Sequence, residues 1–216
     1  MEQKRISAYL ASLESEPEPL LRELRAYAAG HDVPILRAET ERFLYTLIAA
    51  KRPRHILEIG TAIGYSGIVM LRACAEAKLL TVESYEKRIP LARANFARAG
   101  AALSARTELL HEDAGVVLKR LSGGRRQFDF VFLDAAKGQY FNWLPDIIAV
   151  LEEGGLLLAD NVLQDNTVME SRFTVERRDR TTHERMRAFL YAVKHTPELV
   201  SSILPLGDGV SLSVKI

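Results

Sequence analysis

The chain has 216 residues, of which 48% are hydrophobic and 26% are charged, which is enough for one domain with a substantial core. Its 29 Lys and Arg residues against 28 Asp and Glu residues exclude a chain-wide basic coat for nucleic acid, although a local basic patch remains open. A lone cysteine, Cys74, permits no internal disulfide and predicts a reducing, cytoplasmic location. No apolar signal core follows Met1, and no segment approaches the roughly 18 apolar residues of a membrane span, so no membrane partner is expected.

Residues 1–50 are predicted to form N-terminal helices, and strands and helices alternate through a core of residues 51–216. The predicted strands cover residues 55–59, 79–83, 107–111, 128–133 and 155–159, and the predicted helices 66–77, 88–99, 114–121, 140–151 and 184–195. Residues 162–182 are polar and predict a loop or lid. Two β-rich runs, 199–204 and 210–214, flank Gly207-Asp208-Gly209 and predict a hairpin. The order predicts a single α/β domain over 1–216: a doubly wound, mostly parallel, seven-stranded sheet with an antiparallel C-terminal hairpin.

Polar side chains follow two of the apolar strands. Asp134 ends the run 128–133, and Asp160 and Asn161 end the run 155–159. Ligands of open α/β sheets bind beyond the carboxyl ends of the strands, so these three residues are expected to meet. Three oxygen donors without His or Cys indicate Mg²⁺ or Ca²⁺ rather than zinc. The alternatives are that the aspartates cap helices and that Asn161 is a turn residue.

The segment from Glu58 through Gly60 to Gly64 follows another strand and opens a helix. Free N–H groups at a helix start bind anions, but the acidic Glu58 before the first glycine would repel a pyrophosphate and attract an ammonium. S-adenosylmethionine, which carries an ammonium and a carboxylate, therefore fits better than a dinucleotide. Glu83 ends the next strand, where a ribose-binding acid belongs, unless it is only a solvated strand end. Asp113 follows the third strand, where an adenine edge would lie.

The chain resembles the cation-dependent O-methyltransferase family that includes the catechol and caffeoyl-CoA O-methyltransferases. The motifs are Leu57-Glu58-Ile59-Gly60, Gly64-Tyr65-Ser66, Glu83, Asp134-Ala135-Ala136-Lys137 and Asp160-Asn161. Further stretches resemble the bacterial tRNA 5-hydroxyuridine methyltransferases more closely, namely Val33-Pro34-Ile35, Gly138-Gln139-Tyr140, Val162-Leu163 and Leu204-Pro205-Leu206-Gly207-Asp208-Gly209.

This resemblance implies a Rossmann-like class I methyltransferase fold and a homodimer. It implies that Glu58 and Ser66 hold the methionine part of the cofactor, Glu83 the ribose and Asp113 the adenine. It also implies a divalent metal on Asp134, Asp160 and Asn161. Gly60, Gly64, Tyr65, Ala114 and Asp134 complete the expected cofactor site.

Methyl transfer to oxygen needs an oxygen nucleophile that is activated and aligned. A bound Mg²⁺ lowers the pKa of a hydroxyl, and three protein donors leave room for two adjacent substrate oxygens. Asp134 and Lys137 are the expected catalytic residues. A lysine near a cation has a lowered pKa and can act as a base, and the alternative is a solvated loop lysine.

Two substrate classes offer adjacent oxygens: catechol-type phenols and 5-hydroxyuridine. Ser211 stands where the catechol enzymes, as aligned, carry a glutamate, which argues against a simple catechol. Phosphate contacts to a tRNA anticodon loop are expected from Arg172, Arg177 and Arg178, with residues 51–54 and 125–126 as other basic groups. Tyr140 is a candidate to stack on a base, with helix packing as the alternative.

The leading hypothesis is methylation of 5-hydroxyuridine in tRNA to 5-methoxyuridine. The alternatives are a small-molecule O-methyltransferase that acts on a vicinal-oxygen phenol, and a cofactor-binding protein without catalysis, such as an RNA chaperone.

Overall fold

The computed structural model describes residues 5–6, 9, 12–13 and 16–216. The part of the expected N-terminal helices that falls on residues 1–4, 7–8, 10–11 and 14–15 lies outside the described residues. Two long N-terminal helices are described, α2 (Pro19–Gly30) and α3 (Ala38–Lys51). Helix α2 has Pro19 in its first turn, where the missing N–H of proline costs nothing. Helix α3 ends at Lys51, and the next residue, Arg52, adopts the left-handed conformation.

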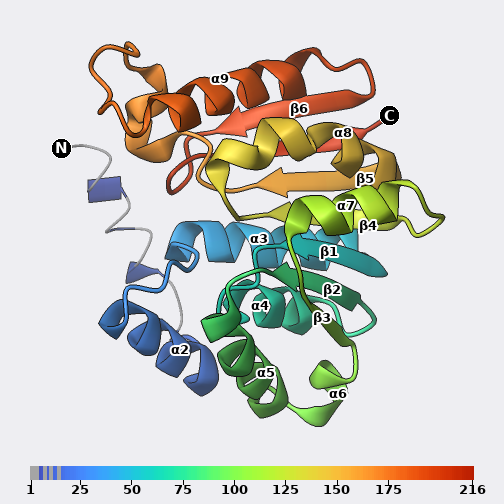
Figure 1. Ribbon diagram of the computed structural model, residues 1–216. Helices are drawn as coiled ribbons and strands as arrows, with labels where there is room; N and C mark the ends of the chain where they lie inside the picture. The colour runs from blue at the N-terminus through green and yellow to red at the C-terminus, as the bar shows by residue number, and fades with distance from the viewer. Residues whose placement is uncertain (1–4, 7–8, 10–11, 14–15) are drawn as a thin grey trace.

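Seven strands form one sheet in the order β3-β2-β1-β4-β5-β7-β6 (Figure 1). They are β1 (His55–Ile59), β2 (Lys78–Glu83), β3 (Thr107–His111), β4 (Phe128–Leu133), β5 (Leu151–Ala159), β6 (Leu199–Leu204) and β7 (Val210–Lys215). Strands β1 to β5 are parallel, and β7 runs antiparallel to both β5 and β6. The predicted mostly parallel seven-stranded sheet with a C-terminal hairpin is therefore confirmed.

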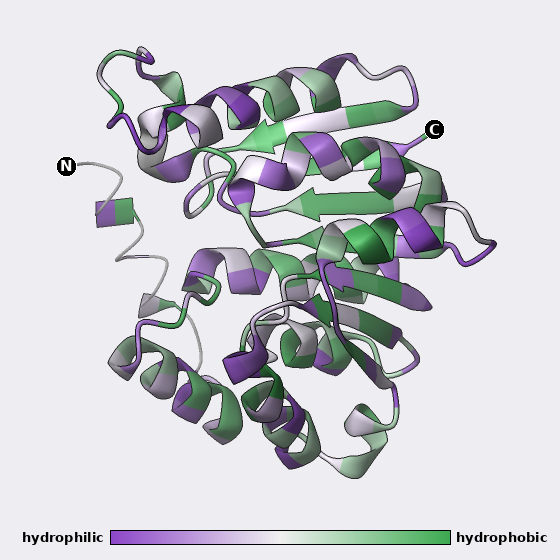
Figure 2. Ribbon diagram, in the orientation of Figure 1, coloured by the Kyte–Doolittle hydropathy of each residue, from purple (hydrophilic) through white to green (hydrophobic). Residues whose placement is uncertain are grey.

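Helices cover both faces of the sheet because successive strand residues point to opposite faces. Ile56 packs in a core with α2, α3, α4 (Tyr65–Ala73) and α5 (Ile89–Arg98). Leu57, the next residue, packs in a second core with α7 (Ala114–Ser122), α8 (Tyr140–Val150) and α9 (Arg180–His195). The strands are mostly hydrophobic, as expected for a sheet buried on both sides (Figure 2). Shorter helical segments are η1 (Glu86–Arg88), α6 (Ala101–Ser104), η2 (Lys137–Gln139) and η3 (Gln164–Met169).

Several predicted boundaries were wrong. Strand β5 begins at Leu151 rather than at residue 155, because its pairing with β4 shifts between Phe128 and Phe130 and accommodates Gly154 at a positive φ of 73°. Helix α4 ends at Ala73, since Cys74 is extended. The segment 162–182 is not a plain loop, because it contains η3 and the start of α9 at Arg180. No helix among the described residues has the length and apolar character needed to cross a bilayer.

Candidate active site

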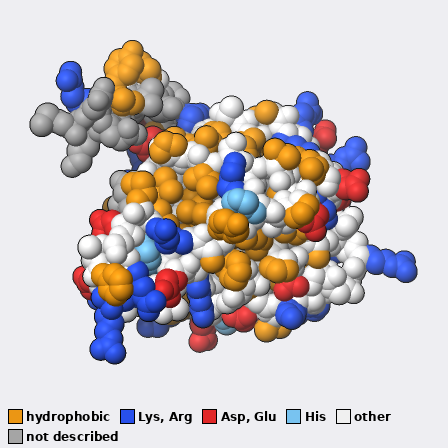
Figure 3. Space-filling model, turned by 90° about the horizontal axis from the view of Figure 1, so that it is seen from above, with side chains coloured by type: hydrophobic (Ala, Val, Ile, Leu, Met, Phe, Trp, Pro, Cys, Tyr) orange, Lys and Arg blue, Asp and Glu red, His pale blue; other side chains and the backbone are white. Residues whose placement is uncertain are grey.

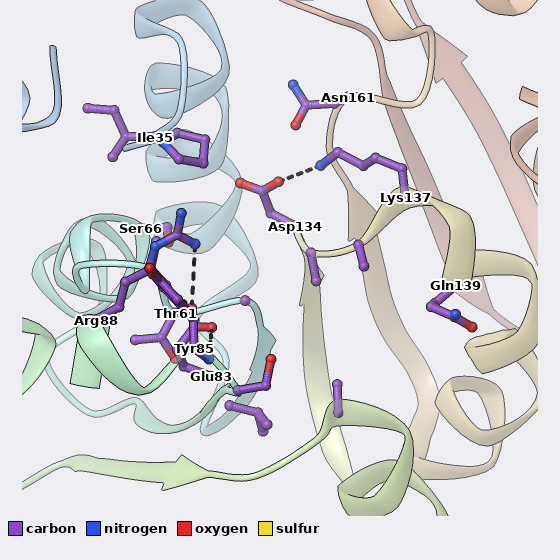
Figure 4. Close-up of a pocket in the computed structure, with 18 of the residues that line it drawn as sticks. Ile35, Thr61, Ser66, Glu83, Tyr85, Arg88, Asp134, Lys137, Gln139 and Asn161 are labelled. Atoms are coloured by element: carbon purple, nitrogen blue, oxygen red, sulfur yellow. Dashed lines mark hydrogen bonds and ion pairs between the residues drawn. The ribbon is translucent and has the colours of Figure 1, made fainter. Parts of the chain in front are cut away.

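A cavity of about 670 Å³ opens at the carboxyl ends of the parallel strands (Figure 4). Its walls carry Gly60 after β1, Glu83 at the end of β2, Asp113 after β3, Asp134 after β4 and Asn161 after β5. The predicted residues therefore come from five strand ends and converge, as the topology of an open α/β sheet requires. Residues 34–36, between α2 and α3, close one side.

The turn after β1 approaches β4 very closely. Gly60 has a φ of 105°, and a Cβ atom there would lie 1.9 Å from the backbone oxygen of Asp134. Only glycine permits this approach. The two halves of the cavity, one around the β1–α4 turn and the other around Asp134, are thus joined at Gly60.

Glu58 lies behind the cavity wall rather than in it. Its carboxylate is fully buried and accepts hydrogen bonds from the hydroxyls of Ser66 and Thr81, each at 2.5 Å. Burial raises the pKa of Glu58 to about 7, although the two hydroxyl donors oppose the shift. Ser66 does line the cavity. Glu58 therefore holds the Ser66 side chain in place. Glu58 itself does not line the cavity, so the expected direct contact between Glu58 and the cofactor is not supported by the structure.

Glu83 has both carboxylate oxygens engaged with the backbone. One accepts a hydrogen bond from the Ala62 N–H and the other from the Tyr85 N–H, both at 2.8 Å. Arg88 Nη1 lies 4.0 Å from Glu83 Oε2 (Figure 4). Each carboxylate oxygen has a second lone pair, so Glu83 can still accept from ribose hydroxyls while it fixes the β1–α4 turn.

The far end of the cavity is formed by Asp113, Ala114 and Trp143. Asp113 caps α7 by accepting a hydrogen bond from the Val116 N–H at 3.1 Å. The indole of Trp143 is close to Gly115, where an added Cβ would lie 3.0 Å from Nε1. The sequence arguments placed Asp113 and Ala114 here, but they did not find Tyr85 and Arg88, because nothing in the local pattern after Glu83 indicates that these side chains turn back to the cavity.

A hydrogen-bond network from the N-terminal helices reaches the cavity through Tyr65. The Tyr65 hydroxyl donates to Glu41 at 2.5 Å and accepts from Arg25 at 2.9 Å. Arg25 also pairs directly with Glu41. Burial, followed by the Glu41 carboxylate, raises the pKa of Tyr65, so its hydroxyl stays protonated. Helices α2 and α3 are therefore tied to the first residue of α4.

Lys137 and Asp134 form an ion pair at 2.6 Å between Nζ and Oδ1. Lys137 also donates to the Tyr140 hydroxyl at 3.0 Å, which in turn lies 3.1 Å from the Leu133 carbonyl oxygen. Although burial disfavours the ammonium, the neighbouring Tyr140 and Asp134 raise the pKa of Lys137. These neighbours are all oxygens, and the expected lowering of the Lys137 pKa, which concerns the site with a cation bound, stays a prediction.

Asp160 and Asn161 lie beside this pair. Asp160 is 2% exposed, and burial together with the charge of Asp134 raises its pKa to about 7. Asn161 has a φ of 57°, a left-handed conformation that asparagine tolerates. No group of three His, Cys, Asp or Glu side chains within the described residues is arranged to hold a metal. The candidate donors are two carboxylates that repel each other and one amide oxygen, a set that fits a hard cation.

None of the other residues considered for substrate contact lines the cavity. Tyr140 is fully buried and packs edge-on against Phe189, so the idea that it stacks on a substrate base is wrong, and helix packing is its role. Ser211 is also fully buried, on β7, and does not line the cavity, so it gives no evidence against a catechol. Arg172 pairs with Glu184, and Arg178 with Glu176 and Asp179. Arg177 is exposed, and no ion pair to it is found among the described residues.

A sequence profile of the O-methyltransferase family matches residues 10–216. The chain belongs to this O-methyltransferase family. Caffeoyl-CoA O-methyltransferase 1 of Eucalyptus globulus is 29% identical over 215 residues, which cover 93% of this chain and 83% of that relative. Catechol O-methyltransferase of Mycobacterium tuberculosis is 30% identical over 167 residues, which cover 76% of this chain and 74% of that relative. The crystal structure of an O-methyltransferase from Bacillus cereus in complex with SAH has a TM-score of 0.85 at 24% identity and covers 98% of this chain and 97% of its own.

The family resemblance, the class I methyltransferase fold and the assignment as an enzyme are therefore confirmed. The protein is therefore an O-methyltransferase, and its relatives include caffeoyl-CoA and catechol O-methyltransferases. The alternative of a cofactor-binding protein without catalysis does not account for this family membership.

Proposed function

We propose that this methyltransferase requires Mg²⁺ and methylates a hydroxyl that has a second oxygen beside it. The observation that carries the proposal is the position of Asp134. Its backbone oxygen abuts Gly60 in the cofactor half of the cavity, and the charge of its side chain raises the pKa of Asp160 in the other half. One residue thus belongs to both halves, which is what alignment of a methyl donor with an oxygen nucleophile needs.

The cofactor half would bind S-adenosylmethionine, which supplies the transferable methyl group. Ser66 would contact the methionine end, with its hydroxyl oriented by Glu58. Glu83 would accept from the ribose hydroxyls, and Asp113 and Ala114 would flank the adenine. Gly60 and Tyr65 line the wall between these contacts. Gly64 does not line it, and contributes by making the turn before α4 at a φ of 85°.

Asp134, Asp160 and Asn161 would hold the Mg²⁺ ion, which when bound would lower the pKa of an adjacent substrate hydroxyl. Lys137, held as an ammonium between Asp134 and Tyr140, would donate a hydrogen bond to the substrate oxygen as its negative charge develops. A role as the base requires Lys137 to lose its own proton first.

For the substrate, we propose 5-hydroxyuridine in the anticodon loop of a tRNA, which would become 5-methoxyuridine in the cytoplasm. The arrangement of the basic groups supports this. Residues 51–54 and 125–126 precede β1 and β4 and so lie at the amino ends of the strands, away from the cavity. Arg172, Arg177 and Arg178 follow β5 on the side where its strand end meets the cavity. This second position suits contacts to phosphates that flank a bound nucleoside.

A small phenol with two adjacent hydroxyls is the second candidate. It is favoured by the caffeoyl-CoA and catechol relatives. Nucleoside mass spectrometry would separate the two, after incubation with S-adenosylmethionine, Mg²⁺ and tRNA that contains 5-hydroxyuridine, with a dihydroxyphenol in a parallel reaction. Formation of 5-methoxyuridine that a chelator abolishes is the expected result. A methylated phenol with unmodified tRNA would overturn the tRNA assignment.

The proposed contact of Arg177 and Arg178 with tRNA can be tested separately. An Arg177→Ala/Arg178→Ala double variant should bind tRNA about tenfold or more weakly and show a reduced salt dependence, with unchanged affinity for S-adenosylmethionine. An Arg125→Ala/Arg126→Ala variant removes the same charge at the opposite edge of the sheet and serves as the matched control. Equal tRNA binding by both variants would contradict the assigned surface.

We also propose that the protein is a homodimer. Helix α9 and strand β6 lie at the top of the molecule in Figure 1, and Figure 3 shows that hydrophobic side chains gather on this face. Two large exposed side chains on these elements are Tyr191 and Val200. Such a face favours association. Light scattering should give the mass of two chains, and Val200→Glu should shift it toward one.

A further inference from the structure

The turn between β6 and β7 is fixed against the segment that carries Asn161. The N–H groups of Val162 and Leu163 donate to the carbonyl oxygens of Gly209 and Asp208, both at 2.9 Å. A Cβ atom at Gly209 would lie 2.2 Å from the Leu163 side chain. The hairpin turn therefore cannot move without moving the loop that follows β5.

Within this contact, the Asp208 carboxylate lies between Arg37 and Asn161. Arg37 Nη2 is 2.5 Å from Asp208 Oδ1, and Asn161 donates from Nδ2 to Asp208 Oδ2 at 3.2 Å. The Asp208 side chain is 15% exposed. Arg37 precedes α3, so a residue from the N-terminal part of the chain holds the carboxylate in place.

A side-chain amide has a donor end and an acceptor end. An ionised carboxylate only accepts hydrogen bonds, so Asp208 selects the orientation in which the Asn161 NH₂ group faces it. The amide oxygen is then left to face the opposite way. Figure 4 shows this oxygen directed toward the Asp134–Lys137 pair, with the nitrogen directed away.

We propose that Asp208 is a positioning residue that presents the oxygen of Asn161 to the cation site. The proposal rests on the metal site proposed above, where the amide oxygen of Asn161, and not its nitrogen, can serve as a ligand to a hard cation. Arg37 contributes by holding the Asp208 carboxylate. Residues that orient metal ligands in this way typically change metal affinity by about 10- to 100-fold when substituted.

The test is Mn²⁺ binding to the full-length protein, measured by electron paramagnetic resonance with Mn²⁺ alone as the probe. Asp208→Asn preserves the shape but offers an NH₂ group as readily as an oxygen, and it should weaken Mn²⁺ binding about tenfold or more. Asp146→Asn is the matched control, because Asp146 accepts a hydrogen bond from Ser122 at 2.8 Å on α8, outside the cavity. It should leave Mn²⁺ affinity unchanged.

Asp208→Asn also removes a negative charge near the cation, and this alone would weaken Mn²⁺ binding. Testing the same substitution in a second variant separates the effect of charge from the effect of Asn161 orientation. In an Asn161→Asp variant both ends of the side chain are oxygens and no selection is needed. Asp208→Asn should then cause no further loss of Mn²⁺ affinity. An equal loss in both backgrounds would show that Asp208 acts by charge alone and would overturn the positioning role.

Two further variants separate this proposal from the function on which it rests. Asp134→Ala and Asn161→Ala should both lose Mn²⁺ binding. The Asn161 and Asp208 variants should retain affinity for S-adenosylmethionine, and all variants should keep a melting temperature near that of the parent. If these two lose Mn²⁺ binding and Asp208→Asn does not, the positioning role is wrong and the metal site stands. If neither loses it, the metal site itself is wrong, and the role of Asp208 falls with it.

Discussion

Lys137 Nζ lies 2.6 Å from Asp134 Oδ1, so the candidate catalytic lysine is paired with a candidate metal ligand. The same lysine contacts the buried Tyr140 hydroxyl at 3.0 Å. Both neighbours favour the ammonium over the free amine, an arrangement that suits the stabilisation of an oxyanion better than the removal of a proton.

Substitutions at Lys137 should separate these tasks. Lys137→Met is expected to lower kcat by about 100-fold or more, with no loss of Mn²⁺ affinity, because a competing positive charge leaves Asp134. Lys137→Arg keeps the charge but cannot act as a base at neutral pH, so it should retain more activity than Lys137→Met if the ammonium is what matters. Steady-state kinetics would measure this. Equal loss in the two variants would favour the base, and an unchanged kcat in Lys137→Met would remove this lysine from the chemistry.

The buried Glu58 predicts a pH dependence of stability. Burial raises its pKa from 4.5 to about 7, so the folded protein holds this proton more tightly than the unfolded chain. Its contribution to stability is therefore present at low pH, declines as the pH rises from about 4.5 to 7, and is constant above that range. The decline amounts to at most about 3 kcal/mol at 1.4 kcal/mol per pKa unit.

Urea unfolding at pH 5 and pH 8 would measure the effect. Between these values Glu58→Gln should lose less stability than the parent protein, because glutamine does not titrate. Glu86→Gln, at an exposed position on η1, is the control and should follow the parent. Parallel behaviour of Glu58→Gln and the parent would rule out the assigned titration.

The Tyr65 hydroxyl should contribute to both stability and cofactor binding. Tyr65→Phe removes hydrogen bonds to Glu41 and Arg25 in a half-buried network, and a loss of about 1–3 kcal/mol in the free energy of unfolding is expected. Tyr45→Phe, at a 38% exposed position on α3, should change little. Denaturant titration and calorimetric binding of S-adenosylmethionine would check both effects, and equal results for the two variants would contradict a role for the network.

The close contact between Gly60 and Asp134 predicts that alanine will be far more destabilising at Gly60 than at an unconstrained glycine. Gly60→Ala would place a Cβ atom 1.9 Å from a backbone oxygen, at a φ of 105°. We expect destabilisation by several kcal/mol and loss of methyl transfer. Gly30→Ala, at the end of α2 with nothing within 4 Å of the new atom, should be neutral or slightly stabilising. Thermal melts of the two variants would decide, and a Gly60→Ala protein that melts with the parent would contradict the close contact.

The sequence predicted what depends on local pattern. The strands β1 and β4 have the predicted bounds because mostly apolar runs end there at a glycine and an aspartate, and these ends deliver Gly60 and Asp134 to one edge of the sheet. The start of β5 was missed because Gly154-Gly155 resembles a turn, whereas the pairing of β5 with β4 carries the strand through it. Tertiary pairing outweighed local propensity there.

Partnerships between distant residues had no local signal. Three such contacts join segments that only the assembled sheet brings together. They are the hydrogen bonds of Glu58 with Ser66 and Thr81, the hydrogen bond of Arg25 with Tyr65, and the hydrogen bond of Asn161 with Asp208. The pKa of Lys137 likewise depends on side chains that the fold brings to it, Tyr140 and Asp134, and its expected lowering by a bound cation stays a prediction.

Strand β7 lies between β5 and β6 in the sheet, although it follows both in the chain. Strand β6 therefore cannot pair with the sheet until β7 has added to β5. A ribosome that has released every residue up to the hairpin turn still carries a chain in which the apolar β5 is an open edge, and open edges recruit other strands. Acquisition of the fold should thus depend on the final segment, and damage or truncation within Val210–Lys215 should produce aggregation rather than a slightly weaker enzyme.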